Sequence, residues 1–138
     1  MRATLAGLVA AFAAVLIVES VGHAIWPPPA GFAEMPPERQ IEEMARLPTG
    51  AIAIVLVAWC AGVLAGGSVA RRLSRGSRIP PLIVAGFIAV SSVAMLVMLP
   101  HPTWFAWATV VALTACGLIV LRPLRSAERC ESSSRTAG

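Results

Sequence analysis

The chain has no lysine, aspartate, asparagine or tyrosine, and only 13% of its 138 residues are charged. Soluble domains carry about a quarter charged residues, which cover their surface. This chain therefore lacks the polar surface that a water-soluble globule needs. Its hydrophobic fraction is 57% and its mean hydropathy is +0.78. These values indicate an integral membrane protein, and the absence of lysine and asparagine is typical of a GC-rich bacterial genome.

Nucleic-acid binding is excluded although the sequence pI is about 10.2. The eleven basic residues are all arginine, and they gather in short segments between apolar runs rather than along one helix face. Catalytic motifs are also missing: the chain has no phosphate loop, nucleophile elbow or carboxylate dyad. Its three cysteines, Cys60, Cys116 and Cys130, form no C-x-x-C motif, so neither a redox nor a zinc motif is indicated. Because no catalytic set is complete, a membrane enzyme comes third among the functions considered.

Four apolar stretches approach the roughly 20 residues that a helix needs to cross the hydrocarbon layer. They are residues 3–26, 50–70, 81–99 and 103–121. Prolines bracket these stretches, and proline fits the first turn of a helix but cannot continue one. We predict an all-α, four-helix transmembrane domain over residues 1–125. The polar, serine-rich tail at 126–138 is expected to be disordered.

A signal peptide is the alternative for the first stretch. Arg2 precedes a long apolar run, and Gly22 and Ala24 have the spacing of small residues at a cleavage site. Cleavage would leave three spans. The run is long for a signal sequence, and Glu19 and His23 are unusual neighbours for a cleavage site, so a first span is favoured.

The distribution of charge predicts the orientation. Residues 71–78 carry four arginines and no acid, and the tail after the fourth stretch begins with three more arginines. Residues 27–49 instead hold four glutamates and two arginines. Since arginine-rich loops stay in the cytoplasm, we expect a multi-pass protein of the bacterial inner membrane with both termini cytoplasmic.

The first outer loop, residues 27–49, is the longest connection. Within it, residues 36–47 predict a short amphipathic helix that begins at Pro36 and Pro37. Its apolar side would comprise Ile41, Met44, Ala45 and Leu47. Such a helix would lie along the membrane–water boundary. A solvated connector that is only partly helical is the alternative.

Small residues recur every four positions in the second span: Ala58, Gly62, Gly66 and Ala70. Small residues let membrane helices approach closely, because lipid gives helices no hydrophobic drive to associate. The spacing predicts a helix contact. That contact could lie within the chain, in a homodimer, or with another membrane protein.

Glu19 and His23 are the first candidates for a functional site. They lie four residues apart and so share one face of the first span. Counted back from Trp26, Glu19 lies about 10 Å inside the membrane and His23 about 4–5 Å. An ionisable residue at such a depth costs about 2–3 kcal/mol and is by default a candidate functional group.

Three further residues are expected to join this site: Ser20, His101 and Trp104. His101 lies in the short segment Pro100-His101-Pro102, at the same outer rim as His23. Glu19, His23 and His101 could bind a divalent metal ion, since imidazole and carboxylate suit zinc. They could instead form a proton path, or Glu19 could pair with His23 in a purely structural role. No other cofactor is expected.

Two resemblances add to this reading. The segment Glu19-Ser20-Val21-Gly22-His23, the run Pro27–Pro29 and the motif Pro100-His101-Pro102-x-Trp104 resemble a group of small, uncharacterised four-span bacterial inner-membrane proteins. Glu19 followed by x-x-Gly in the first span also resembles the small multidrug resistance transporters. That second resemblance implies exchange of protons for cations at the glutamate. Here Glu19 lies nearer the outer end, the first loop is longer, and tyrosine is absent.

The sequence thus favours proton-linked transport or ion handling through an outer-facing Glu/His site. The alternative is a structural or accessory subunit that binds another membrane protein through small-residue helix faces such as Ala58, Gly62, Gly66 and Ala70.

Overall fold

The computed structural model describes residues 1–27, 29–98 and 103–122. Within these ranges the chain is helical and has no strand. The elements are α1 (Arg2–Ile25), the 3-10 helix η1 (Phe32–Glu34), α2 (Pro37–Arg46), α3 (Thr49–Leu73), α4 (Ile79–Met98) and α5 (Thr103–Leu121). Helices α1, α3, α4 and α5 are long and apolar enough to cross a membrane. The predicted all-α fold of a multi-pass membrane protein is confirmed.

The helix boundaries agree with the sequence to within three residues. The largest difference is the end of α3, which continues to Leu73 because Arg71 and Arg72 lie in its last turn, where cations stabilise the helix dipole. Helix α4 begins at Ile79, so that Pro80 lies in its first turn, where proline is tolerated. The predicted end of the third span at residue 99 and the tail at 126–138 lie outside the described residues.

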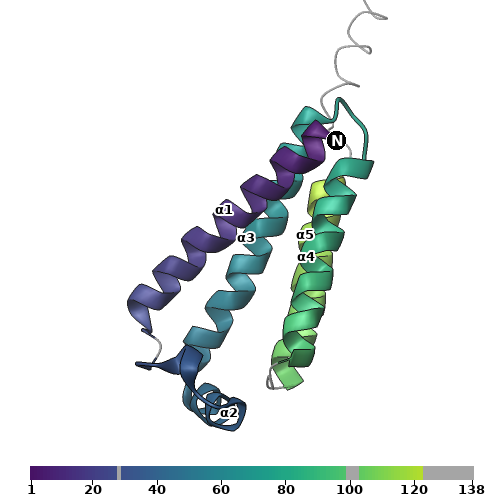
Figure 1. The fold of residues 1–138 in the computed structure, drawn as a ribbon. Helices are drawn as coiled ribbons and strands as arrows, with labels where there is room; N and C mark the ends of the chain where they lie inside the picture. The colour runs from purple at the N-terminus through teal and green to yellow at the C-terminus, as the bar shows by residue number, and fades with distance from the viewer. Residues whose placement is uncertain (28, 99–102, 123–138) are drawn as a thin grey trace, which may run out of the picture.

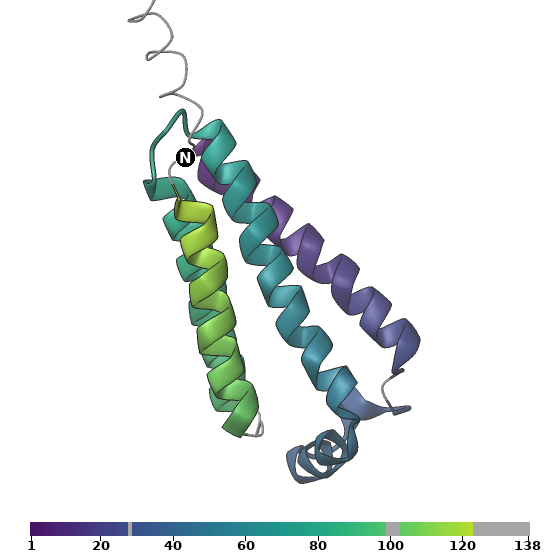
Figure 2. The ribbon, with the colours of Figure 1, turned by 180° about the vertical axis from the view of Figure 1, so that it is seen from behind.

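Helix α3 is the central element of the fold. It packs against α1, α4 and α5, and α4 and α5 pack against each other. Figures 1 and 2 show the long helices close together at the end that carries the N-terminus and the α3–α4 connection. Toward the opposite end, α1 and the α4–α5 pair spread away from α3. Helix α2 lies at this spread end.

The small-residue face of α3 is used within the chain. Ala58, Gly62, Gly66 and Ala70 are all buried. A Cβ atom on Gly66 would lie 2.5 Å from the carbonyl oxygen of Gly7 and 2.6 Å from the Cβ atom of Ala11, both in α1. The predicted helix contact is therefore the contact of α3 with α1, in which the two backbones nearly touch.

Polar groups in the core are satisfied by their own helices. The buried hydroxyls of Ser92 and Thr109 donate to the carbonyl oxygens of Ile88 and Phe105, each four residues earlier, at 2.8 Å. This is the pattern that a hydrocarbon environment requires, because lipid offers no hydrogen-bond partners. Trp59 is only 7% exposed and packs between α3 and α5 against Phe105.

Helix α2 confirms the short helix expected in the first outer loop, which begins here at Pro37 and ends at Arg46. Figure 1 shows it almost end-on below α3, so it runs across the long helices rather than along them. Ile41 is exposed and Leu47 is half-buried. The side chains of Met44 and Ala45 lie outside the described part of the structure.

Candidate functional site

Glu19 and His23 line one pocket at the spread end of the bundle. The pocket has a volume of about 290 Å³. Glu19 is half-buried in it, whereas His23, one helical turn nearer the end of α1, is exposed. The other lining residues are largely apolar or aromatic: Gly22, Trp26, Pro29, Phe32, Leu47, Ala51, Ile54, Val55 and Met95. The pair predicted from its four-residue spacing thus forms the ionisable part of an otherwise apolar cavity.

Trp26 closes the pocket at the end of α1. Its backbone N–H donates to the carbonyl oxygen of Gly22 at 2.8 Å and completes the last turn of the helix. Its ring lies over Gly50 in the first turn of α3, so closely that a Cβ atom on Gly50 would lie 2.8 Å from Cζ2 of the ring. The glycine therefore lets the indole lie flat against α3 and joins the ends of the two helices.

Phe32 supplies a second aromatic side chain from the segment between α1 and α2. The turn before it uses Gly31 with φ +71°, a left-handed conformation that suits glycine. The side-chain amide of Gln40 in α2 donates to the carbonyl oxygens of Phe32 and Met35, each at 3.1 Å. The segment between α1 and α2 is thus tied to α2, and its Phe32 lines the pocket.

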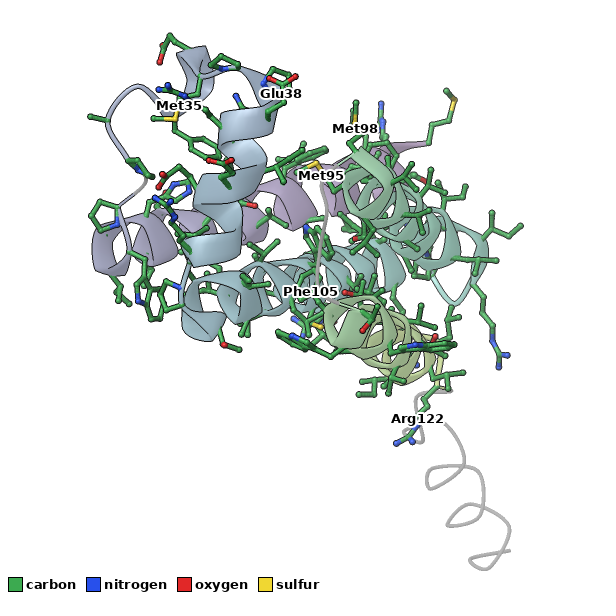
Figure 3. All side chains as sticks on the ribbon, turned by 90° about the horizontal axis from the view of Figure 1, so that it is seen from below. Met35, Glu38, Met95, Met98, Phe105 and Arg122 are labelled. Atoms are coloured by element: carbon green, nitrogen blue, oxygen red, sulfur yellow. The ribbon has the colours of Figure 1, made fainter. Side chains whose placement is uncertain are left out.

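Helix α4 completes the lining through Met95. Figure 3 looks onto this end of the bundle and shows Met95 on the side of α4 that faces α1. Phe105 points from α5 toward α3, where it packs against Trp59 with ring centroids 5.9 Å apart. The pocket therefore has contributions from three of the four long helices.

Glu19 and His23 share the pocket without forming an ion pair. Within the described residues the one ion pair joins Arg46 and Glu43 at 3.2 Å, on the surface of α2. A structural Glu19–His23 ion pair, one of the roles considered from the sequence, is thus not formed here. The carboxylate and the imidazole remain available to a ligand or a proton.

The proposed metal site is only partly within the described residues. Two of its three ligands, Glu19 and His23, line the same pocket. The third, His101, lies outside the described residues. Among the residues that the structure covers, no three His, Cys, Asp or Glu side chains are grouped so that they could hold a metal ion.

The structure does not bring Ser20 or Trp104 to this pocket. Ser20 follows Glu19 and so projects about 100° further around α1; it is exposed, and its hydroxyl donates to the carbonyl oxygen of Leu16 at 2.7 Å. Trp104 is 44% exposed on α5 and packs edge-on against Phe105. Neither residue is among those that line the cavity.

Most of the wall residues were not identified from the sequence. Trp26, Phe32, Ile54 and Met95 were not singled out as site residues. One signal was available: Gly31, whose left-handed φ of +71° makes the turn just before Phe32. The contribution of Met95 depends on how α4 is placed against α1, which no local pattern gives.

Comparison with family models, with curated proteins and with solved structures found no match for this chain. Its resemblances to small four-span bacterial proteins and to small multidrug resistance transporters therefore stay predictions from its motifs.

Proposed function

We propose that this protein binds a small organic cation in the Glu19–His23 pocket and couples the movement of that cation across the membrane to protons. The observation that carries the proposal is a carboxylate and an imidazole in one cavity of about 290 Å³ whose other walls are largely apolar or aromatic. Ligand sites have this composition: apolar walls give affinity, and a few polar groups fix the ligand's orientation.

The chemistry of the walls favours a cationic ligand. The half-buried carboxylate of Glu19 supplies a counter-charge for it. Trp26 and Phe32 supply aromatic rings, and cations bind to the faces of such rings with favourable energy. An anionic solute would meet the Glu19 carboxylate and no arginine in the lining.

Proton coupling follows from the same two ionisable groups. A carboxyl group inside a membrane helix can hold a cation in one state and a proton in the other, so the two exchange at one site. His23 is exposed one turn nearer the end of α1 and suits the transfer of protons toward Glu19, since the two ring nitrogens of an imidazole can accept and donate a proton. The resemblance of Glu19-x-x-Gly22 to small multidrug resistance transporters implies the same exchange.

Localisation in a bacterial inner membrane with both termini cytoplasmic belongs to this proposal. Its support is the separation of charge along the bundle. The arginine-rich α3–α4 connection is at one end, and α2, which carries three glutamates, is at the other (Figure 1). The positive-inside rule assigns the arginine-rich end to the cytoplasm, and the Glu19–His23 pocket then faces outward.

The pocket can be tested with benzyltrimethylammonium, a cation with one ring and one quaternary head. Calorimetric titration of the purified protein in a neutral detergent should detect binding that Glu19→Gln weakens by about tenfold or more, as loss of a charged partner does. Glu42→Gln, an equal change of charge on exposed α2, should bind like the parent protein. Equal binding by both variants would contradict the proposed site.

A divalent metal ion is the second ligand to test in this pocket, because Glu19 and His23 are two of the three expected ligands. Mass spectrometry of the purified protein would measure bound metal directly. Near-stoichiometric metal that is lost in both Glu19→Gln and His23→Ala would mean that the ligand of this pocket is a metal ion and not an organic cation. Absence of metal from all samples would eliminate the metal site.

An accessory subunit of another membrane protein is the alternative function. The small-residue face of α3 would be its docking surface, but Gly66 and its neighbours already contact α1. A partner would have to bind the outward faces of the helices instead. Such a subunit would copurify with its partner and would tolerate Glu19→Gln.

A further inference from the structure

A second pocket lies at the opposite end of the bundle from Glu19. It has a volume of about 270 Å³ and is lined by three arginines: Arg71 in α3, Arg78 just before α4, and Arg122 just after α5. The remaining lining residues are Gly76, Ser77, Pro81, Val120 and Leu121. Arginines from three separate segments thus line one cavity.

Arg71 is held in place by the helix beside it. Its Nη1 donates to the carbonyl oxygen of Val120 in the last turn of α5 at 2.7 Å, and its side chain is half-buried. A guanidinium group has five N–H donors in a fixed planar arrangement. The bond to Val120 uses one of them, so Arg71 can bind an oxyanion while it stays anchored between α3 and α5.

The α3–α4 connection is an ordered turn. The hydroxyl of Ser74 lies 2.7 Å from the carbonyl oxygen of Ser77 and 2.9 Å from that of Arg71. Gly76 has φ +95°, which favours glycine. The turn thereby places Arg78 in the same cavity lining as Arg71.

Acidic side chains do not neutralise this pocket within the described part of the chain. The described glutamates are Glu19 on the outer half of α1 and four residues between α1 and α3, at the far end of the bundle. The one described ion pair, Arg46–Glu43, is also there. Three positive charges around one cavity favour a phosphate group, which guanidinium binds with paired, charge-assisted hydrogen bonds.

An apolar groove adjoins the arginine pocket. It lies between α4 and α5, has a volume of about 370 Å³, and shares Leu121 with the arginine pocket. On α4 it extends from Leu82 to Leu96, about 21 Å along the helix axis. One leaflet of the hydrocarbon layer is about 15 Å thick. The groove is therefore long enough to hold an acyl chain over the full depth of the leaflet.

Small residues give this groove its depth. Gly86 of α4 and Gly117 of α5 both line it. A Cβ atom on either glycine would meet no other atom within 4 Å. Neither glycine is therefore needed for packing inside the chain, in contrast to Gly66. Space for a neighbouring molecule is left beside both.

We infer that the protein binds one anionic phospholipid at this site, with the phosphate on Arg71, Arg78 and Arg122 and an acyl chain between α4 and α5. A cationic pocket that continues into an apolar groove matches a molecule with an anionic head and a long apolar tail. Basic pockets between membrane helices bind anionic lipid head groups in this way. The site is separate from the Glu19–His23 pocket and does not depend on the proposed function.

Native mass spectrometry of the full chain in neutral detergent tests the head-group part. Dioleoyl phosphatidylglycerol should be retained about fivefold or more over dioleoyl phosphatidylcholine, because at least one arginine contacts the anionic head group. The double variant Arg78→Gln/Arg122→Gln should lose this preference. Arg72→Gln/Arg75→Gln removes the same charge from residues outside the pocket and should keep it. Equal loss in both double variants would mean that only net charge attracts the lipid, and would overturn the site.

Two further experiments test whether the bound phosphate belongs to a lipid or to a free anion, and whether the groove holds an acyl chain. Inorganic phosphate should not displace phosphatidylglycerol; displacement at millimolar concentration would assign the pocket to a free anion instead. Gly86→Leu/Gly117→Leu fills the groove and should reduce phosphatidylglycerol retention, whereas Ala94→Leu/Ala115→Leu, on exposed positions outside the groove, should not. Unchanged retention in Gly86→Leu/Gly117→Leu would overturn the acyl-chain assignment. A parent protein that is dimeric, with a groove variant that is monomeric, would also overturn it, because a second copy of the chain would then occupy the groove.

Discussion

Gly66 is the point where α1 and α3 approach most closely, since a Cβ atom there would lie 2.5 Å from the carbonyl oxygen of Gly7. Gly66→Ala should therefore push the helices apart. We expect it to lower the free energy of unfolding by about 1–3 kcal/mol, as overpacking does. The measurement is the thermal midpoint of the purified protein in detergent, followed by circular dichroism.

Gly86→Ala is the matched control, because a Cβ atom at Gly86 meets nothing within 4 Å. Alanine is the better helix former, so this variant should be as stable as the parent or slightly more stable. If Gly66→Ala and Gly86→Ala had the same midpoint, the close approach of α1 and α3 would be wrong.

Glu19 and His23 are the part of the site that could be predicted from the sequence. Their four-residue spacing puts them on one helix face in any α-helix, and both do line one pocket. Trp104 could not be placed in the same way. Its distance from Glu19 depends on how α5 rotates against the bundle, and spacing along the chain contains no information on that rotation.

At the scale of the elements, α3 and α5 are held side by side along much of their length. Near one end Trp59 packs against Phe105. The thiols of Cys60 in α3 and Cys116 in α5 are close enough to interact. At the end that carries the α3–α4 connection, Arg71 donates to the carbonyl oxygen of Val120. These contacts connect the α1–α3 pair to the α4–α5 pair.

The neighbouring cysteines allow a direct test of this pairing. In a Cys130→Ser background, mild oxidation with copper phenanthroline should join Cys60 to Cys116 within one chain. Intact mass measurement after alkylation would then find no free thiol and no dimer. Two alkylated thiols after oxidation, or a disulfide-linked dimer, would contradict the arrangement of α3 against α5.

Helix boundaries could be predicted because prolines and charges bound each apolar stretch, whereas the packing faces mostly could not. In a membrane both lipid and neighbouring helices are apolar, so a hydrophobic pattern does not mark which face turns inward. Small residues were the exception, since Gly62 and Gly66 did identify the inward face of α3. No comparable signal marked the face of α4 that presents Met95.

At the scale of the whole molecule, the outer surfaces of the long helices are apolar. Large side chains such as Val90, Val97 and Trp107 are more than 70% exposed. A soluble monomer rarely exposes continuous apolar surface of this kind, whereas in a bilayer such surface contacts lipid. Polar and charged side chains gather at the two ends of the bundle.

The orientation of the bundle can be measured by labelling single cysteines in a variant whose three native cysteines are replaced by alanine. A membrane-impermeant maleimide added to intact cells should label Glu42→Cys in α2. Arg75→Cys in the α3–α4 turn should react only after the inner membrane is permeabilised, because arginine-rich loops stay in the cytoplasm. The reverse pattern would put the Glu19–His23 pocket on the cytoplasmic side.

The proposed function requires that Glu19 couple cation movement to protons. Uptake of radiolabelled benzyltrimethylammonium into proteoliposomes under an imposed pH gradient measures this coupling. Gradient-dependent uptake is expected for the parent protein and for Glu42→Gln, and none above empty liposomes for Glu19→Gln. Uptake by Glu19→Gln at the parent rate would contradict the proposed role of Glu19.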